Sequence, residues 1–205
     1  FDGDGFVIAD FAEFDDEDWD GVAIDDAGGI IVAGATQSPR VGVVARYLTS
    51  GAVDAGFGTN GATLAPFEEQ SELSAVAVDA EGRIIAGGCP LVPGFEAEGF
   101  GLVRLTAEGA PDPAFGGGGS VITTMESEAV PEPNGCITDL KIDAKGRIVA
   151  AGWATDPETP GQQIMVAARY LDDGSLDPGF GEGGIVRIVF PGQTNAQAGG
   201  IDIGA

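Results

Sequence analysis

Apolar and polar residues alternate along three short stretches of the chain, which lie 54 and then 64 residues apart. Because the side chains of a β-strand point alternately to its two faces, this pattern predicts a strand with one buried face. A second stretch, apolar at nearly every position, follows each time at residues 30–33, 84–87 and 148–151, and it predicts a strand covered on both faces. The alternating stretches are Val22-Ala23-Ile24, Val76-Ala77-Val78 and Leu140-Lys141-Ile142.

The same short turn joins the two strands each time. Residues 142–149 read Ile-Asp-Ala-Lys-Gly-Arg-Ile-Val, residues 78–85 read Val-Asp-Ala-Glu-Gly-Arg-Ile-Ile, and residues 24–31 are a looser copy, Ile-Asp-Asp-Ala-Gly-Gly-Ile-Ile. The aspartate can accept hydrogen bonds from nearby backbone amides, and the glycine can take the positive φ that closes the turn. The pattern therefore predicts a repeated β-hairpin.

Each unit continues with a third strand that ends on arginine, a long turn, and a short fourth strand. An aspartate lies eight residues beyond each arginine, and a Phe-Gly pair begins three residues later. A guanidinium partly removed from water needs a carboxylate partner, so we predict that each arginine pairs with its aspartate while the phenylalanine packs between units. Contact with a ligand is the alternative. The residues are Arg46, Asp54 and Phe57, then Arg104, Asp112 and Phe115, then Arg169, Asp177 and Phe180.

Four short antiparallel strands repeated in tandem are typical of an all-β β-propeller, in which each unit is one blade. We predict blades at residues 19–65, 66–124 and 125–190. Residues 1–18 are then the outer strand of a preceding or closing blade, and residues 191–205 begin a fourth. Three units are few for a closed ring. We therefore expect an incomplete ring, a piece of a longer chain, with further blades from the same chain or from a second copy.

The connections between strands fall into a constant and a variable class. Successive connections of an up-and-down sheet alternate between its two ends, so the variable ones share one side, here named the loop side. The hairpin turns and Phe-Gly turns share the opposite, hairpin side. The variable connections hold 17 of the 33 acidic residues and a single basic one, Arg40. The loop side is therefore predicted to be strongly negative.

The whole chain is also acidic, with 33 acidic against 9 basic residues and a net charge of −24. This charge repels nucleic acid, so we expect no nucleic-acid partner. Three interpretations remain open: a solvated surface suited to salty surroundings, the binding of cations, and the attraction of a cationic partner. We expect no membrane span, because no apolar run approaches 18 residues.

The chain has no histidine, which removes the commonest general base and metal ligand. The usual Ser–His and Cys–His nucleophile pairs and the usual zinc sites are thereby excluded. Cys89 ends one predicted strand and Cys136 begins another, both toward the loop side in successive units. A disulfide is within reach if those blades adjoin, and two buried thiols are the alternative.

Candidate ligand-binding residues lie at the edge of the loop side. Asp15, Asp16 and Asp18 form the densest acidic cluster, and Trp19 and Trp153 are the aromatic candidates. A ring beside carboxylates suits a sugar or a cation. The alternative is a solvated acidic run with rings that pack on neighbouring strands. We expect no cofactor, with calcium as the exception that the acids would suit.

Two strings resemble the bacterial delta-60 repeat. One is Ala-Val-Asp-Ala-Glu-Gly-Arg-Ile-Ile-Ala-Gly at residues 77–87, and the other is Ala-Arg-Tyr-Leu-Asp-Asp-Gly-Ser-Leu-Asp-Pro-Gly-Phe-Gly at residues 168–181. The resemblance covers nearly all of the chain. It implies a β-propeller in a secreted or cell-surface protein, with no general activity assigned to the family. By similarity to related propeller repeats, the alternating strand is expected to be the innermost of each blade.

We therefore predict a non-catalytic extracellular or cell-surface β-propeller module. It would serve as a scaffold for adhesion, surface assembly or ligand display, with a carbohydrate or protein partner. One alternative is a carbohydrate-active enzyme with paired carboxylates on the loop side, which needs two carboxyl groups about 5–5.5 Å or about 6.5–9.5 Å apart. A calcium-binding surface repeat protein is the other.

Overall fold

The computed structural model describes residues 17–92, 98–124, 134–159, 161–190, 192 and 194–204. All regular secondary structure in these ranges is β-strand, arranged as three separate four-stranded antiparallel sheets. Each sheet takes its strands in chain order. The first sheet holds β1 (Glu17–Ile24), β2 (Ile30–Thr36), β3 (Gly42–Tyr47) and β4 (Ala62–Leu64). The second holds β5 (Leu73–Val78), β6 (Ile84–Gly88), β7 (Phe100–Leu105) and β8 (Ser120–Thr123), and the third holds β9 (Gly135–Ile142), β10 (Ile148–Thr155), β11 (Gln163–Tyr170) and β12 (Ile185–Ile188).

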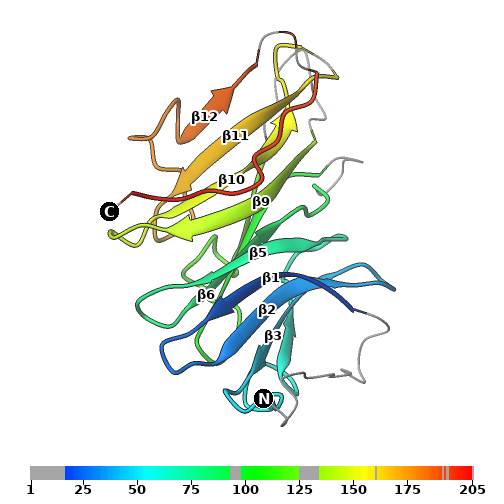
Figure 1. Cartoon of the computed structure of the whole chain (residues 1–205), viewed down its shortest axis with the longest axis vertical. Helices are drawn as coiled ribbons and strands as arrows, with labels where there is room; N and C mark the ends of the chain where they lie inside the picture. The colour runs from blue at the N-terminus through cyan, green and yellow to red at the C-terminus, as the bar shows by residue number, and fades with distance from the viewer. Residues whose placement is uncertain are drawn as a thin grey trace.

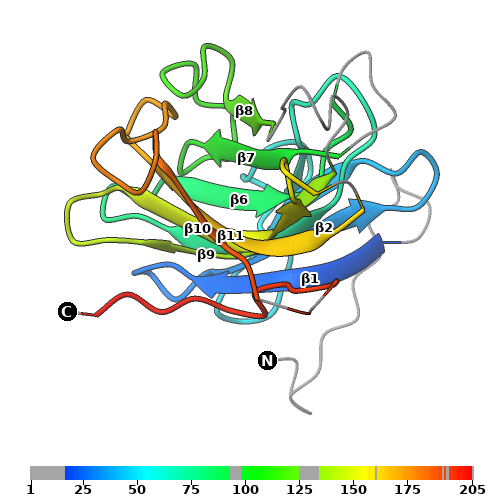
Figure 2. The ribbon, with the colours of Figure 1, turned by 90° about the horizontal axis from the view of Figure 1, so that it is seen from above.

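The three sheets pack face to face in a row, with the second between the other two (Figure 1). The first strands of successive sheets contact each other, because β5 lies against both β1 and β9. The later strands run outward from this shared edge, and β7 and β8 lie far from β1 when the molecule is viewed from above (Figure 2). The predicted all-β fold of repeated four-stranded blades is thereby confirmed.

Two apolar clusters fill the spaces between the sheets. Residues of the first and second sheets, such as Ile31, Val44 and Val103, form one cluster. Phe100 and Leu102 meet the third sheet in the other. Every residue of β6 is buried, which confirms for the second sheet the prediction that the second strand is covered on both faces, whereas Ile30 and Val32 of β2 are only partly buried. Each large apolar side chain buried in this way contributes roughly 1.5–3 kcal/mol.

The alternating strand behaves differently in the first sheet. In β5, Val76 and Val78 pack on the apolar cluster shared with the first sheet. In β1, the equivalent residues Val22 and Ile24 are 67% and 69% exposed. The prediction of one buried apolar face is therefore wrong for β1 in the part of the chain that the structure describes. The reason is that Val76 and Val78 have a neighbouring sheet to cover them, whereas no described sheet covers that face of β1.

The repeated hairpin turn has the hydrogen bonds that its sequence predicts. Asp79 Oδ1 accepts hydrogen bonds from the amides of Glu81 and Arg83, at 3.0 and 2.8 Å. Gly82 closes the turn with a φ of 78°, which a residue with a β-carbon rarely adopts. The turns after β1 and β9 repeat the same bonds through Asp25 and Asp143.

The segment 194–204 forms no strand but lies along the third sheet (Figure 1). Thr138 Oγ1 donates to the carbonyl oxygen of Ala198 at 2.6 Å, and the Ile201 amide donates to Asp139 Oδ2 at 2.9 Å. The assignment of residues 191–205 to a fourth blade stays a prediction. The strand predicted within residues 1–18 lies outside the described residues except for its last two positions, which belong to β1.

Candidate functional site

The recurring arginine, aspartate and phenylalanine meet within each unit. Arg46 Nε, Arg104 Nε and Arg169 Nε each donate to an aspartate Oδ2 at 2.8 Å, namely that of Asp54, Asp112 and Asp177. Each guanidinium carbon also lies over a ring, 4.8 Å from the centroid of Phe57 and of Phe115, and 4.5 Å from that of Phe180. A carboxylate and a ring face together fix the orientation of the planar guanidinium.

This arrangement also joins one sheet to the next. Arg46 Nη1 donates to the carbonyl oxygen of Ala107 at 2.5 Å, and Arg104 Nη1 donates to that of Asp172. Ala107 and Asp172 occupy matching positions in the turn that follows the third strand of the next unit. We call this set of contacts the latch. The arginine, the aspartate and the phenylalanine of the latch therefore make structural contacts within the protein, and these contacts hold one sheet against the next.

Two carboxylates on the hairpin side, those of Asp172 and Asp177, are stabilised in their charged form. The Arg83 guanidinium, which donates to Asp172 Oδ1 at 2.7 Å, lowers the pKa of Asp172. The Gly179 amide, followed by the guanidinium of Arg169, lowers the pKa of Asp177. These carboxyl groups are committed to hydrogen bonds with the chain and are poorly suited to moving protons.

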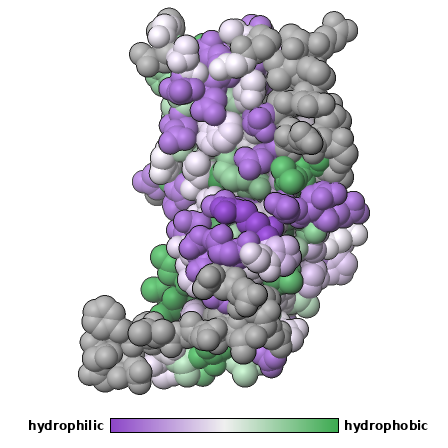
Figure 3. All heavy atoms as spheres, turned by 90° about the vertical axis from the view of Figure 1, so that its right-hand side faces the viewer, coloured by the Kyte–Doolittle hydropathy of each residue, from purple (hydrophilic) through white to green (hydrophobic). Residues whose placement is uncertain are grey.

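The loop side carries a different acidic group at the junction of the first two sheets, which we name the junction patch: Asp18, Asp20, Arg40, Glu72 and Glu98. Arg40, from the connection after β2, forms an ion pair with Glu72 at the start of β5. Gln37 Nε2 donates to Asp18 Oδ2. Hydrophilic side chains gather near the middle of the molecule in a view turned 90° from Figure 1 (Figure 3). Four acids around one arginine leave this patch negative.

Two acids of the junction patch hold their protons more tightly than usual. Burial, with the nearby Glu72 and Asp18 carboxylates, raises the pKa of Asp20, whose carboxyl group lies within hydrogen-bonding reach of Glu72. Burial and the Glu72 charge also raise the pKa of Glu98. Like charges brought together disfavour full ionisation. The patch therefore favours an arriving cation, since a cation would relieve this repulsion.

The predicted ligand-binding residues do not form a common site among the described residues. Asp15 and Asp16 lie outside the described residues. Asp18 belongs to the junction patch, whereas the Trp19 ring packs against the apolar cluster formed by β3 and β4. Trp153 lies in the third sheet, where β10 pairs it with Cys136 and Met165. The two rings are therefore on different sheets.

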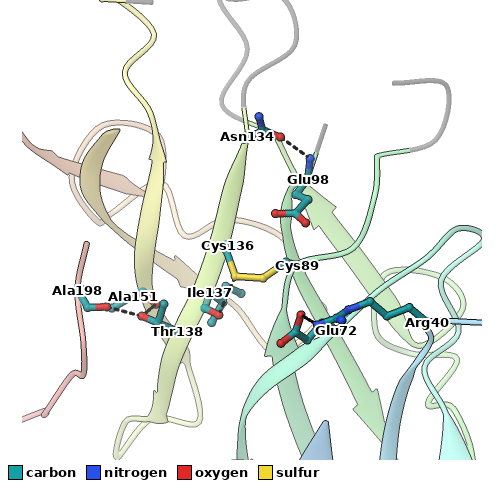
Figure 4. The surroundings of a disulfide bond; sticks show 10 residues. All are labelled: Arg40, Glu72, Cys89, Glu98, Asn134, Cys136, Ile137, Thr138, Ala151 and Ala198. Atoms are coloured by element: carbon teal, nitrogen blue, oxygen red, sulfur yellow. Dashed lines mark hydrogen bonds and ion pairs between the residues drawn. A yellow bond between two sulfur atoms is a disulfide. The ribbon is translucent and has the colours of Figure 1, made fainter. Parts of the chain in front are cut away.

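Cys89 and Cys136 form a disulfide that joins the end of β6 to the start of β9 (Figure 4). It links the second sheet to the third on the loop side. The bond lies close to the junction patch, because Cys89 N donates to the carbonyl oxygen of Glu72 at 2.9 Å. Asn134 Oδ1, next to β9, accepts from the Glu98 amide at 3.0 Å.

Sequence reasoning missed Asp20, Glu72 and Glu98 as partners. They come from three separate parts of the chain, namely β1, the connection before β5 and the connection between β6 and β7, and nothing in their local sequence separates them from other surface acids. The available signal was Arg40, the single base among the variable connections. Among the described residues, no group of three or more potential metal ligands is found, so the calcium prediction gains no site there. No described helix is long and apolar enough to cross a membrane.

Comparison with known families agrees with the repeat and its fold. Residues 28–57, 80–115 and 146–180 match the family model described as "Domain of unknown function (DUF5122) beta-propeller". Each matched segment runs from the hairpin turn to the phenylalanine of the latch. No curated protein matches the chain. The three sheets are therefore blades of a β-propeller whose repeats are similar to that family of unknown function.

Proposed function

We propose that this protein is a non-catalytic β-propeller module, of the bacterial delta-60 repeat type, that acts outside the cell or on its surface as a rigid binding scaffold. The observation that carries the proposal is the disulfide between Cys89 and Cys136, which fastens two blades together beside the junction patch. Disulfides form and persist in oxidising compartments and are rare in the cytosol. Loops held on a rigid scaffold are a common place for binding.

The junction patch supports a binding role more than a catalytic one. Its acids come from β1 of the first blade and from two connections of the second, and the ion pair between Arg40 and Glu72 fastens the two blades together. The proposed partner is a protein or glycan that presents cationic groups, because the acidic side attracts such groups over a distance set by salt. Its specific role would be adhesion, surface assembly or ligand display.

An enzyme with paired carboxylates is not favoured by this geometry. Asp20 and Glu72 are within hydrogen-bonding reach of each other. Glu72 is also held in an ion pair with Arg40, and a carboxylate committed to a guanidinium in this way is poorly suited to act as a nucleophile or a general base.

Location and redox state are tested on the native protein. Source cells are treated with a thiol-blocking reagent before lysis, then fractionated, and the peptides that contain Cys89 and Cys136 are identified by mass spectrometry. The proposal expects the two peptides linked to each other, in the secreted or cell-surface fraction. Recovery in the cytosol with both thiols blocked would overturn it.

Binding is tested with octalysine and a panel of amine-bearing oligosaccharides by biolayer interferometry. The triple variant Asp18→Asn/Asp20→Asn/Glu98→Gln removes three charges from the junction patch. The control Asp26→Asn/Glu108→Gln/Glu182→Gln removes three exposed charges from the hairpin side. We expect at least tenfold weaker binding for the first variant and little change for the control. Equal losses in both would show that net charge alone, and not the junction patch, attracts the partner.

A further inference from the structure

The first hairpin lacks an arginine that the other two share. The second and third hairpins carry Arg83 and Arg147 four residues after their aspartates, and the first carries Gly29 in that place. Gly29 has no positive φ, so its backbone is not one that requires glycine. The Asp25 carboxylate lies over Gly29 instead, because a β-carbon at this position would come within 2.6 Å of Asp25 Oδ2.

The other two hairpins show what normally fills this position. Arg83 Nε donates to Asp79 Oδ2 at 2.6 Å, and Arg147 Nε donates to Asp143 Oδ2 at 2.7 Å. In the third unit, Arg147 Nη1 also lies 3.3 Å from Asp177 Oδ2, which already accepts from Arg169. Asp177 thus accepts from the guanidinium groups of both Arg147 and Arg169, while Asp143 holds that of Arg147.

The first unit has both carboxylates of this arrangement but lacks the guanidinium that corresponds to Arg147. Asp25 Oδ1 accepts from the amides of Ala27 and Gly29, at 2.9 and 2.7 Å, which holds the carboxylate as in the other hairpins. Asp54, the counterpart of Asp177, is paired with Arg46. Within the described ranges, no ion pair reaches Asp25 Oδ2.

A pocket of about 240 Å³ lies at this place. Asp25, Gly29 and Asp54 line it together with Arg46, and Tyr47, Leu48 and Thr49 complete its wall. The pocket combines two carboxylates with apolar and aromatic surface. Such walls suit a flat cation carried on an apolar stem. The contribution of Arg46 is no obstacle, because Arg147 and Arg169 share Asp177 in the same manner.

We propose that this pocket binds a guanidinium group supplied from outside the chain, in the place that Arg147 fills in the third unit. Asp25 Oδ2 accepts one N–H of the guanidinium, and Asp54 accepts another while it keeps Arg46. The group comes either from an arginine side chain of a partner protein or from a small guanidinium compound. The site is on the hairpin side, so it is independent of the junction patch and of the function proposed for it.

The test uses ¹⁵N-labelled protein and three probes: agmatine, the capped peptide acetyl-Gly-Arg-Gly-amide, and butylamine as a cation without a guanidinium. The amides of Ala27 and Gly29 report directly, because both donate to the Asp25 carboxylate. We expect saturable shifts of these two amides with at least one guanidinium probe and at least tenfold weaker binding of butylamine. Tighter binding of the peptide than of agmatine identifies a protein partner, and the reverse order identifies a small compound.

Two variants decide whether the pocket is responsible. Gly29→Arg supplies the missing side chain from the chain itself, so it should abolish binding once the Asp25 carboxylate has shifted away from the added β-carbon. Asp25→Asn keeps an oxygen for the two amide hydrogen bonds but loses the charge, and it should weaken binding at least tenfold in a folded protein. No saturable shift with either guanidinium probe, or unchanged binding in the folded Asp25→Asn variant, would overturn the proposal.

Discussion

Arg104 donates through Nη1 to the backbone carbonyl of Asp172, a residue 68 positions later in the chain and in the next blade. The side chain of Arg104 is only 2% exposed, and its Nε simultaneously donates to Asp112. A charge so fully removed from water is stabilised only by such partners. The latch is therefore both an ion pair within one blade and a tie between two blades.

Replacing Arg104 by methionine should destabilise the protein by about 3–5 kcal/mol, because a buried pair loses one partner and Asp112 keeps its charge. The matched variant is Arg169→Met in the third unit, where the side chain is 17% exposed and its contacts with other described residues stay within the unit. We expect a loss near 1 kcal/mol there. Urea unfolding followed by circular dichroism measures both. Similar losses at the two positions would contradict the inter-blade role.

Gly109 and Gly146 offer a second matched pair. Both have positive φ, 85° and 76°, so alanine is strained by about 1–2 kcal/mol at either position. A β-carbon at Gly109 would also come within 2.8 Å of the Phe57 ring and of the Gly58 nitrogen, whereas one at Gly146 meets nothing within 4 Å. We expect Gly109→Ala to lose about 1–3 kcal/mol more than Gly146→Ala. Chemical denaturation of the two variants measures the difference, and equal losses would show that the turn does not press on Phe57.

The disulfide should stabilise the fold chiefly by restricting the unfolded chain. The bond spans 47 residues of sequence, for which loop closure predicts about 4 kcal/mol, within a usual range of about 2–4 kcal/mol. We expect Cys89→Ala/Cys136→Ala to lose about 2–4 kcal/mol in unfolding free energy. Reductant should lower the stability of the wild type by a similar amount and leave the variant unchanged. A response of the variant to reductant would point to another cause.

The raised pKa of Asp20 predicts a pH-dependent gain on neutralising it. Because the folded state favours the protonated carboxyl group, its contribution to stability is present below the ordinary value of 3.8 and is lost as the pH rises through the raised pKa. Asp20→Asn should therefore be more stable than the wild type at pH 7, with the difference shrinking toward pH 3.5. Thermal unfolding across that range measures it.

The control for that experiment is Asp26→Asn, which removes one exposed charge on the hairpin side. It corrects for the general relief of repulsion in a protein of net charge −24. A gain at pH 7 that is no larger for Asp20→Asn than for Asp26→Asn would show that the junction patch holds no special repulsion.

By itself, the sequence determined the local structure of this protein. The hairpin turns follow from an aspartate and a glycine at fixed spacing, and the buried second strands follow from unbroken apolar runs. These features depend on residues a few positions apart, because turn conformation and the alternation of side chains along a strand are properties of a short segment of chain. Repetition then identified the four-stranded unit, because a pattern that recurs with the same turns must form the same element each time.

Only the tertiary structure decided which distant groups meet. It placed Arg40 against Glu72 and Arg104 against Asp172, and it left Val22 exposed where Val76 is partly buried. It also showed that Gly29 leaves a pocket between Asp25 and Asp54. Such contacts depend on how one sheet lies on the next. The same residue types serve as solvated surface or as buried partner according to what the neighbouring blade brings to them.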